Sequence, residues 1–257
     1  MDYLKYNREA WNEQTRCGCE WTVPVDQPTI AKARQGEWSI VLTPQQAVPA
    51  DWMEPVKGKD ILCLAGGGGQ QAPILAAAGA NVTTFDNSDQ QLEQDQIVAR
   101  REGLTIGAIQ GDMADLSAID DASFDLIVNP CSNCFVPDLQ PVWNECFRVL
   151  RPSGHLISGW TNPILYVFDY EESQQGNLVV RHKIPYSDQE ALTETELQKL
   201  IDENEPLCYG HTLEDQIGGQ LRAGFQMVDF YEDDWGESGE TLSKFIQSFC
   251  ATRSQKP

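Results

Sequence analysis

The sequence contains no apolar run that approaches the roughly 18 residues a membrane span requires. Its first residues, MDYLKYNREAWNEQ, are polar and aromatic and include no apolar signal segment. Basic residues are scarce too, since 18 Lys and Arg stand against 39 Asp and Glu, for a formal net charge of −21. A surface this acidic repels nucleic-acid phosphates and anionic lipid headgroups. We therefore expect a cytoplasmic protein that binds neither nucleic acid nor membranes, and its oligomeric state stays open.

Internal repeats and low-complexity tracts are also absent, and cysteine is too sparse for a disulfide scaffold. The chain has 8 cysteines in 257 residues, and in a reducing compartment most such residues act as small apolar fillers. Cys131 and Cys134 form a C-x-x-C pair, and Cys17 and Cys19 form C-x-C. Zinc binding or redox chemistry would be possible for such pairs. We expect no metal and interpret them as small residues in a crowded site.

What the sequence does contain, from Lys59 onward, is an alternation of short apolar runs and helical segments. The run DILCLA is continuously apolar, as expected of a strand buried on both faces of a sheet. Strands that alternate with helices require right-handed crossovers and predict a doubly wound, parallel α/β sheet. The predicted strands span residues 60–65, 81–86, 104–112, 124–130 and 155–160, and the predicted helices span 71–80, 89–103 and 137–150.

The last part of the chain predicts a reversal of strand direction. A helix is expected at residues 212–224, followed by extended segments at 225–235 and 244–253. No helix fits between those two segments, so they should pair antiparallel. The prediction is therefore a seven-stranded α/β sheet, mostly parallel with one antiparallel strand.

Two segments fall outside this alternation. Residues 1–56 are expected to form an N-terminal cap segment that begins with a helix at 3–14, and residues 57–257 the main domain. An inserted lid is expected at about 161–212, within the main domain. It is predicted to contain a hairpin made of residues 165–170 and 177–186, and then a polar helix at 188–204.

Four consecutive glycines, Gly66 to Gly69, follow the first predicted strand, and Asp86 ends the second. Ligands of open α/β sheets bind outside the carboxyl ends of the strands. Glycines there let a ligand approach backbone N–H groups without a Cβ in the way. The Asp86 carboxylate can accept two hydrogen bonds from a ribose diol. A glycine-rich turn beside a helix-capping Asp is the interpretation that needs no ligand.

The loop alone does not identify the ligand. Gly67, Gly69 and Ala72 also satisfy G-x-G-x-x-A, which is typical of dinucleotide-binding folds. An NAD(P)-dependent reductase is therefore an alternative at this point.

Further motifs follow in order along the chain. QGDM places Asp112 at the end of the third predicted strand, Asn129 ends the fourth, and FRVLRPSGHLI joins a helix to the fifth strand through a tight turn. Together with the glycine loop, Asp86 and the reversed last strand, these motifs resemble the class I S-adenosylmethionine-dependent methyltransferases, most closely the small-molecule group that carries a variable cap. The resemblance covers residues 57–160 motif by motif and 212–253 by pattern.

The resemblance implies a Rossmann-like methyltransferase domain, S-adenosylmethionine as cofactor, and a small-molecule methyl acceptor. The chain departs from the family at Cys63, where an acidic residue is usual, and at Ala65, where the first glycine of the loop is usual. Because of Cys63, a cofactor-binding regulator without catalysis is a further alternative. The residues implied in cofactor binding are Cys63, Ala65, Gly66, Gly67, Gly69, Asp86, Asn87, Gln91, Asp112, Met113, Asn129 and Pro130.

The motifs leave the catalytic residue unknown. Methyl transfer from a sulfonium is an in-line displacement that depends on alignment and on exclusion of water. A general base is needed only for a poorly acidic hydroxyl or a protonated amine. His211 is the candidate base, with helix capping or packing as the alternative. The candidate acceptor-binding residues are Tyr6, Trp11, Trp160, Tyr166 and His211, and the acceptor itself stays open.

Overall fold

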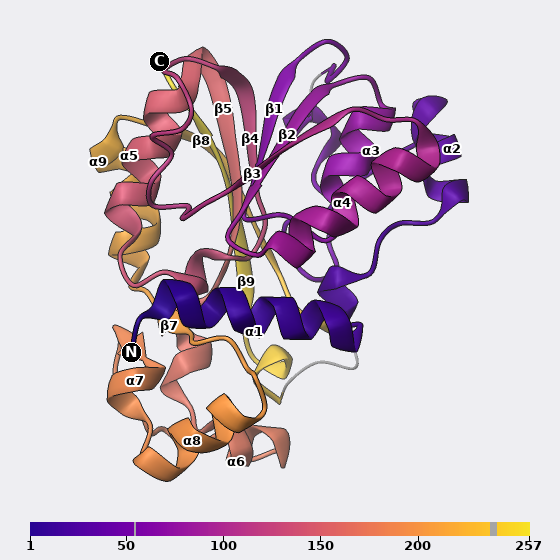
Figure 1. The fold of residues 1–257 in the computed structure, drawn as a ribbon. Helices are drawn as coiled ribbons and strands as arrows, with labels where there is room; N and C mark the ends of the chain where they lie inside the picture. Colours follow the sequence, from indigo (N-terminus) through magenta and orange to yellow (C-terminus); the bar gives the residue numbers. More distant parts are fainter. Residues whose placement is uncertain (54, 237–240) are drawn as a thin grey trace.

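A single large sheet forms the centre of the protein, whose computed structural model describes residues 1–53, 55–236 and 241–257. Within the described residues, seven strands are ordered β3-β2-β1-β4-β5-β9-β8 (Figure 1). The first five are parallel, and β9 runs antiparallel to both β5 and β8. This confirms the predicted mostly parallel, doubly wound sheet. The strands are β1 (Asp60–Leu64), β2 (Asn81–Asp86), β3 (Ile106–Gln110), β4 (Phe124–Asn129), β5 (Leu150–Thr161), β8 (Gln226–Asp233) and β9 (Phe249–Gln255).

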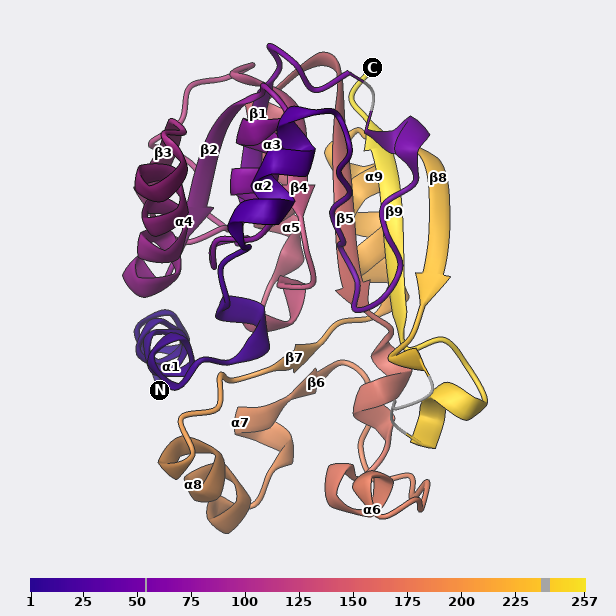
Figure 2. The same cartoon turned by 90° about the vertical axis from the view of Figure 1, so that its right-hand side faces the viewer.

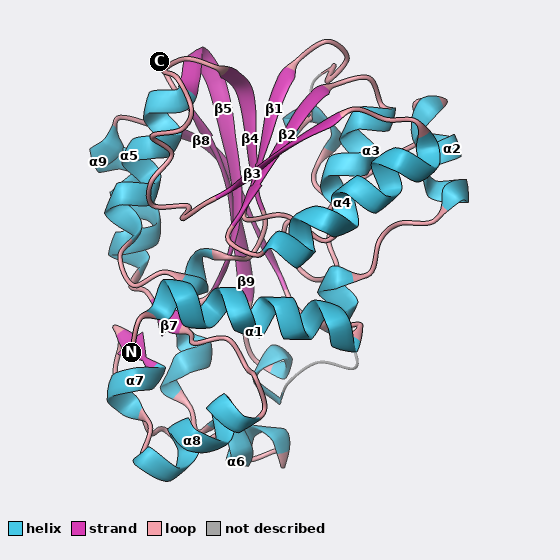
Figure 3. Cartoon of the chain, in the orientation of Figure 1, coloured by secondary structure: helices cyan, strands magenta, loops and turns pink. Residues whose placement is uncertain are grey.

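Helices cover both faces of the sheet and form a three-layer arrangement (Figure 3). One face carries α2 (Gln27–Arg34), α3 (Gln71–Ala77) and α4 (Asp89–Glu102), and the other carries α5 (Leu139–Val149) and α9 (Gly219–Ala223). Strand β1 is the reason both faces must be covered, because Ile61, Leu62, Cys63 and Leu64 are all buried. Ile61 and Cys63 join the apolar cluster on one face, and Leu62 and Leu64 join the cluster on the other.

Several predicted boundaries shift in the structure. The N-terminal helix α1 (Tyr3–Cys17) is longer than expected and ends at Gly18, which takes the left-handed conformation with φ 75°. Strand β5 begins at Leu150, so His155 lies within it rather than at its start. The predicted helix at 212–224 is a π-helical turn at Glu214–Gly218 followed by the short helix α9.

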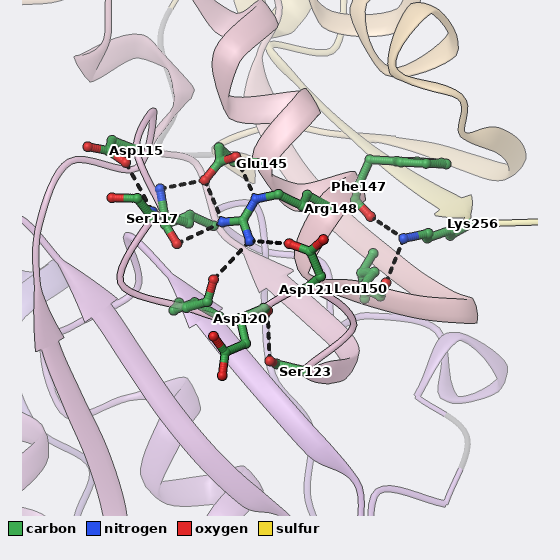
Figure 4. Close-up of polar contacts among 12 residues, drawn as sticks. Asp115, Ser117, Asp120, Asp121, Ser123, Glu145, Phe147, Arg148, Leu150 and Lys256 are labelled. Carbon is green, nitrogen blue, oxygen red and sulfur yellow. Dashed lines mark hydrogen bonds and ion pairs between the residues drawn. The ribbon is translucent and has the colours of Figure 1, made fainter.

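Arg148 on α5 forms a polar network at the end of the sheet opposite the glycine loop (Figure 4). Its guanidinium forms ion pairs with Glu145 and Asp121, each at 2.7 Å, and donates to the backbone carbonyls of Leu116 and Ile119. These carboxylates raise the pKa of Arg148 above its ordinary value. The network ties α5 to the loop that enters β4 and so fixes the end of the sheet opposite the site.

The remaining elements lie beyond the carboxyl ends of the parallel strands. Helix α1 crosses these ends, and the lid elements lie on its far side (Figures 1 and 2). The lid contains α6 (Tyr170–Gln174), β6 (Tyr186–Ser187), α7 (Asp188–Ala191), α8 (Glu194–Asp202) and β7 (Tyr209–Gly210).

The internal structure predicted for the lid was largely wrong. The expected hairpin is reduced to one isolated antiparallel bridge between Phe168 and Val180, while β6 pairs with the distant β7. The expected helix at 188–204 is broken in two, because Thr193 adopts an extended backbone and begins α8 with a capping box to Glu196. The polar sequence predicted one helix here. The capping box at Thr193 and the pairing of β6 with β7 determined where the helices actually begin and end.

Candidate active site

A cavity of about 830 Å³ lies between the sheet edge, α1 and the lid. Its wall brings together most of the predicted site residues from segments far apart in the sequence. The predicted residues that line it are Ala65, Gly66, Gly67, Asp86, Asn87, Gln91, Asp112, Met113, Pro130, Trp11 and Tyr166. Those outside its wall are Cys63, Gly69, Asn129, Tyr6, Trp160 and His211.

Three backbone N–H groups of the glycine loop, those of Gly67, Gly68 and Gly69, are already bonded within the protein. Gly67 donates to the Asp86 carboxylate at 3.0 Å, Gly68 to the Gln91 carbonyl at 3.0 Å, and Gly69 to the Asp95 carboxylate at 2.9 Å. A dinucleotide pyrophosphate needs free N–H groups of this kind, since it binds at the loop and helix N-terminus. With two carboxylates occupying that position, the loop fits a ligand group without phosphate.

Asp86 lies at the carboxyl end of β2 and faces the cavity. One carboxylate oxygen accepts from Gly67 and the other from the Ser88 N–H at 2.9 Å. Burial raises the pKa of Asp86 to about 6, against the lowering effect of its backbone hydrogen bonds. A carboxylate has about four acceptor positions, so two remain for hydroxyl groups in the cavity.

Asp95 is a polar group that the sequence analysis missed. It lies on the buried face of α4, four residues after Gln91, with a side chain 0% exposed. Its Oδ2 has no hydrogen-bond partner among the described residues, and burial raises its pKa to about 7. The available signal was the i, i+4 spacing of Gln91 and Asp95 on the same face as Leu92 and Val98.

Helix α1 contacts the ends of β2 and β3 directly. The Tyr3 hydroxyl donates to Asp112 at 3.1 Å, and Arg8 donates to the Asn87 side chain at 3.2 Å. Asn87 in turn donates to the Leu4 carbonyl at 2.8 Å. Two polar residues of the cavity wall, Asp112 and Asn87, are therefore oriented by the N-terminal segment. This supports the predicted placement of the segment over the site.

The chain between α1 and α2 also packs on the glycine loop. Val25 donates its N–H to the Gly69 carbonyl at 2.8 Å, and Gly69 has φ 77°. A Cβ at Gly69 would lie 2.8 Å from Pro24 Cβ and 3.1 Å from the Gln94 carbonyl oxygen. The group that approaches the Gly69 backbone closely is therefore Pro24 of the protein itself and not a ligand.

We expect Gly69→Ala to lower the free energy of unfolding by about 2–3 kcal/mol, through left-handed backbone strain and a clash with Pro24. Gly103→Ala is the matched control. Gly103 also has positive φ, 66°, but has open space where its Cβ would lie, so only about 1–2 kcal/mol of strain is expected. Urea denaturation of both variants measures the difference, and equal losses would contradict the packing argument.

Cys63 and Ala65, the two departures from the family pattern, occupy different surroundings. Cys63 is fully buried in β1, where burial raises the pKa of its thiol well above the ordinary value. Ala65 lines the cavity and has φ 46°, the left-handed conformation that glycine adopts more easily. The loop therefore keeps the backbone geometry that a glycine would have at this position.

Asn129, Tyr6 and Trp160 serve other parts of the structure. The Asn129 amide donates to the Leu64 carbonyl and to Ser132, and its oxygen accepts from Ser158, so it ties β1, β4 and β5 together. Tyr6 donates to the Glu205 carbonyl. Trp160 is 1% exposed and packs near Phe230.

His211 is buried and lies against the short helix Asn133–Phe135. Its Nε2 lies 3.1 Å from the Asn133 carbonyl oxygen and 2.9 Å from that of Val136. Both neighbours accept hydrogen bonds only, so this nitrogen carries the proton and donates. Burial lowers the pKa of the imidazole. The ring therefore orients backbone beside the cavity, and its role as a base stays a prediction.

Cys131 and Cys208 both line the cavity, and burial raises the pKa of Cys131. Among the residues that the structure describes, no group of three or more His, Cys, Asp or Glu side chains is arranged to hold a metal. In the same part of the chain, none of the helices has the length and apolar character to cross a bilayer.

Comparison with known proteins agrees with this fold and site. A family model described as "Methyltransferase domain" matches residues 62–158. Two solved structures of S-adenosylmethionine-dependent methyltransferases share the fold at 16% identity. They are one from Mesorhizobium loti (TM-score 0.60, 80% of this chain and 94% of that one) and a putative one from Listeria monocytogenes (0.62, 81% and 94%). The fold and these comparisons define an S-adenosylmethionine-dependent methyltransferase of class I.

A full-length relative makes the assignment more specific. The chain is 51% identical over 253 residues to "Uncharacterized methyltransferase YbaJ" of Bacillus subtilis, covering 98% of each. It is 36% identical to the sterol 24-C-methyltransferase erg6 of Aspergillus fumigatus, but over only 39% of this chain and 26% of that one. The chain belongs to the methyltransferase family represented by the Bacillus protein. This family membership excludes the reductase alternative.

Proposed function

We propose that the protein binds S-adenosylmethionine across the glycine loop and Asp86, and methylates a small, partly apolar molecule held between the sheet edge and the lid. The observation that carries the cofactor assignment is the hydrogen bonding of the glycine loop and Asp86. The N–H groups of Gly67, Gly68 and Gly69 are all bonded within the protein, and Asp86 keeps acceptor positions toward the cavity.

The residues present fit this cofactor. S-adenosylmethionine has a ribose diol and an adenine but no phosphate, so it needs no free loop N–H groups. The diol can donate to the two open acceptor positions of Asp86. Asp112 accepts a hydrogen bond from the Tyr3 hydroxyl through Oδ2. Its carboxylate lies beside the position expected for the adenine amino group. The bound cofactor supplies an electrophilic methyl group on a positively charged sulfur.

The chain's own contribution to the reaction is alignment and exclusion of water. The Gly66 backbone and the Pro130 ring, which lies 3.3 Å from where a Gly66 Cβ would be, form one wall of the cavity. Helix α1 and the lid cover the opposite side. Such enclosure holds an acceptor against the methyl group and can lower the barrier by several kcal/mol. A small acceptor is favoured because α1 and the lid lie over the carboxyl ends of the strands and bound the cavity on that side.

The acceptor region supports a partly apolar molecule. Beyond the cofactor positions the wall is rich in aromatic side chains, and Trp11 packs edge-on against Phe135 at 5.1 Å. Large apolar surfaces of this kind bind molecules with rings or hydrocarbon bodies.

Calorimetric titration with S-adenosylhomocysteine and NADH, in parallel, tests the proposal. We expect saturable, stoichiometric binding of S-adenosylhomocysteine and none of NADH, because the Gly67, Gly68 and Gly69 N–H groups are already bonded within the protein and do not face a pyrophosphate. Binding of NADH without S-adenosylhomocysteine would overturn it. Transfer of labelled methyl from S-adenosylmethionine to components of a metabolite extract then distinguishes an enzyme from a cofactor-binding regulator.

A further inference from the structure

The lid contributes a buried carboxylate to the acceptor side of the cavity. Asp188, the first residue of α7, is 6% exposed and lines the cavity. It accepts from the Tyr186 hydroxyl at 2.7 Å and from the Cys208 N–H at 2.6 Å. These two bonds hold the carboxylate in place and leave it acceptor positions that they do not use.

Asp188 forms no ion pair with any described residue. Arg181 is engaged by Asp169 at 2.8 Å and by Glu196 at 2.7 Å, and Lys199 is engaged by Glu171 at 2.6 Å. The basic residue whose charge acts on Asp188 is His182. Burial and the charge of Arg181 lower the pKa of His182, which disfavours its cationic form.

The groups around Asp188 are otherwise acidic or phenolic. Tyr186 and Cys208 bond to it. Burial is the main reason that the pKa values of Tyr6 and Tyr209 are raised, and the charge of Asp188 adds to the effect at both. Burial is the main reason that the pKa of Asp188 itself is raised. A buried carboxylate without a cation is unfavourable, and a positive charge supplied by a ligand would compensate it.

Aromatic rings flank the same position. Tyr166 and Tyr186 stack with their centroids 5.3 Å apart and an interplanar angle of 27°, and His182 packs against Tyr186 at 5.1 Å. All three residues line the cavity. Aromatic faces attract cations, and more strongly where water is excluded.

The charge of the lid wall disfavours the opposite kind of ligand. Arg181 and Lys199 face the cavity, but their charges are already matched by carboxylates. Glu203 and Glu205 add acidic groups to the same wall. An acceptor with a carboxylate or phosphate would therefore meet repulsion, and among the described residues of this wall neither Arg181 nor Lys199 is free to pair with it.

We propose that Asp188, together with the rings of Tyr166 and Tyr186, binds a protonated amine on the methyl acceptor. The acceptor is then an amine with an apolar body, and Asp188 anchors its ammonium group within the lid. This inference rests on the proposed function, because it assigns the acceptor side of the same cavity. It names the group that is recognised and leaves open which atom receives the methyl group.

The test uses the full-length protein saturated with S-adenosylhomocysteine and a panel of alkyl and arylalkyl amines, each with its alcohol and carboxylate counterpart. Binding is measured by calorimetry at pH 7.5. We expect members of the amine series to bind at least about tenfold more tightly than their alcohols, and the carboxylates to bind most weakly. An amine series that binds no better than the alcohols would overturn the proposal, whatever the variants do.

Asp188→Asn removes the charge and keeps a side chain able to bond to Cys208 and Tyr186. We expect it to reduce the amine preference about tenfold or more while alcohol and S-adenosylhomocysteine affinities stay within about twofold. Asp202→Asn, at an exposed carboxylate of α8 that lies outside the cavity wall, is the matched control, and its amine preference should remain. An unchanged amine preference in Asp188→Asn would overturn the inference. Failure of the wild-type protein to bind S-adenosylhomocysteine would instead overturn the proposed function.

Discussion

We expect Asp86→Ala to bind S-adenosylhomocysteine at least about 100-fold more weakly than the wild-type protein. A hydrogen bond to a charged group contributes about 1.5–3 kcal/mol, and the ribose diol is proposed to donate two of them to this carboxylate. The variant also leaves the Gly67 and Ser88 N–H groups without their acceptor, which loosens the loop. Isothermal titration of the folded variant measures the loss.

Asp120→Ala is the control for this measurement. Asp120 is an exposed carboxylate at the far edge of the sheet, beside the Arg148 network (Figure 4). Its removal should leave the affinity unchanged. An Asp86→Ala protein that is folded and binds with wild-type affinity would refute the ribose role. Since the pKa of Asp86 is about 6, we also expect wild-type affinity to be constant above about pH 7 and to fall below pH 6, as the carboxylate gains a proton.

We expect Asp95→Asn to make the ligand-free protein more stable at pH 8, by up to about 4 kcal/mol. Burial raises the pKa of this carboxyl from 3.8 to about 7. A tenfold change in a dissociation constant is worth about 1.4 kcal/mol, so ionising Asp95 in the folded state opposes folding by roughly this amount. Asparagine can still accept from the Gly69 N–H and carries no charge.

The direction of the stability change with pH follows from how many protons Asp95 binds in the folded and in the unfolded protein. Between pH 4 and pH 7 the folded protein keeps the Asp95 proton and the unfolded chain loses it, so stability falls as pH rises through this window. The stabilisation by Asp95→Asn should therefore grow from near zero at pH 4 to its full size above pH 7. Urea denaturation at pH 4.5, 6 and 8 measures it, with Asp120→Asn as the control. A variant equally or less stable than wild type at pH 8 would contradict the argument.

This buried acid also bears on the missing acidic residue of β1. Cys63 stands where the resemblance to the family leads us to expect an acidic residue. Burial is the main reason that the pKa of its thiol is raised, and the charge of the nearby Asp95 adds to the effect. The Asp95 carboxylate reaches the glycine loop from α4 and fixes Gly69, the last of the four glycines. A carboxyl group thus lies beneath the loop from a different element of the fold.

Much of the fold, and the glycine loop with Asp86 in the candidate site, could be predicted because the sequence patterns that indicate them are local. The continuous apolar run of β1, the glycines after it and Asp86 at the end of β2 follow from strand burial and from the geometry of one β-α-β unit. The sequence shows no pattern of a crossover helix between its last two extended segments, and this was enough to predict the antiparallel β9. Prediction from short-range periodicity was wrong in the lid, because β6 pairs with β7, and the two strands are separated in the sequence by α7 and α8.

Only the tertiary structure decided which side chains share the cavity. Tyr3 meets Asp112 across 109 positions of sequence, Gly69 meets Asp95, and Asp188 meets Cys208 across the lid. None of these contacts has a local pattern, because each depends on two elements brought together by packing of the whole chain. The sequence by itself determined the sheet, the loop and the acid at its end. Packing determined that the N–H groups of Gly67, Gly68 and Gly69 are occupied and that His211 donates to backbone carbonyls. It also placed Asp188, which forms no ion pair with a described residue, in the cavity wall.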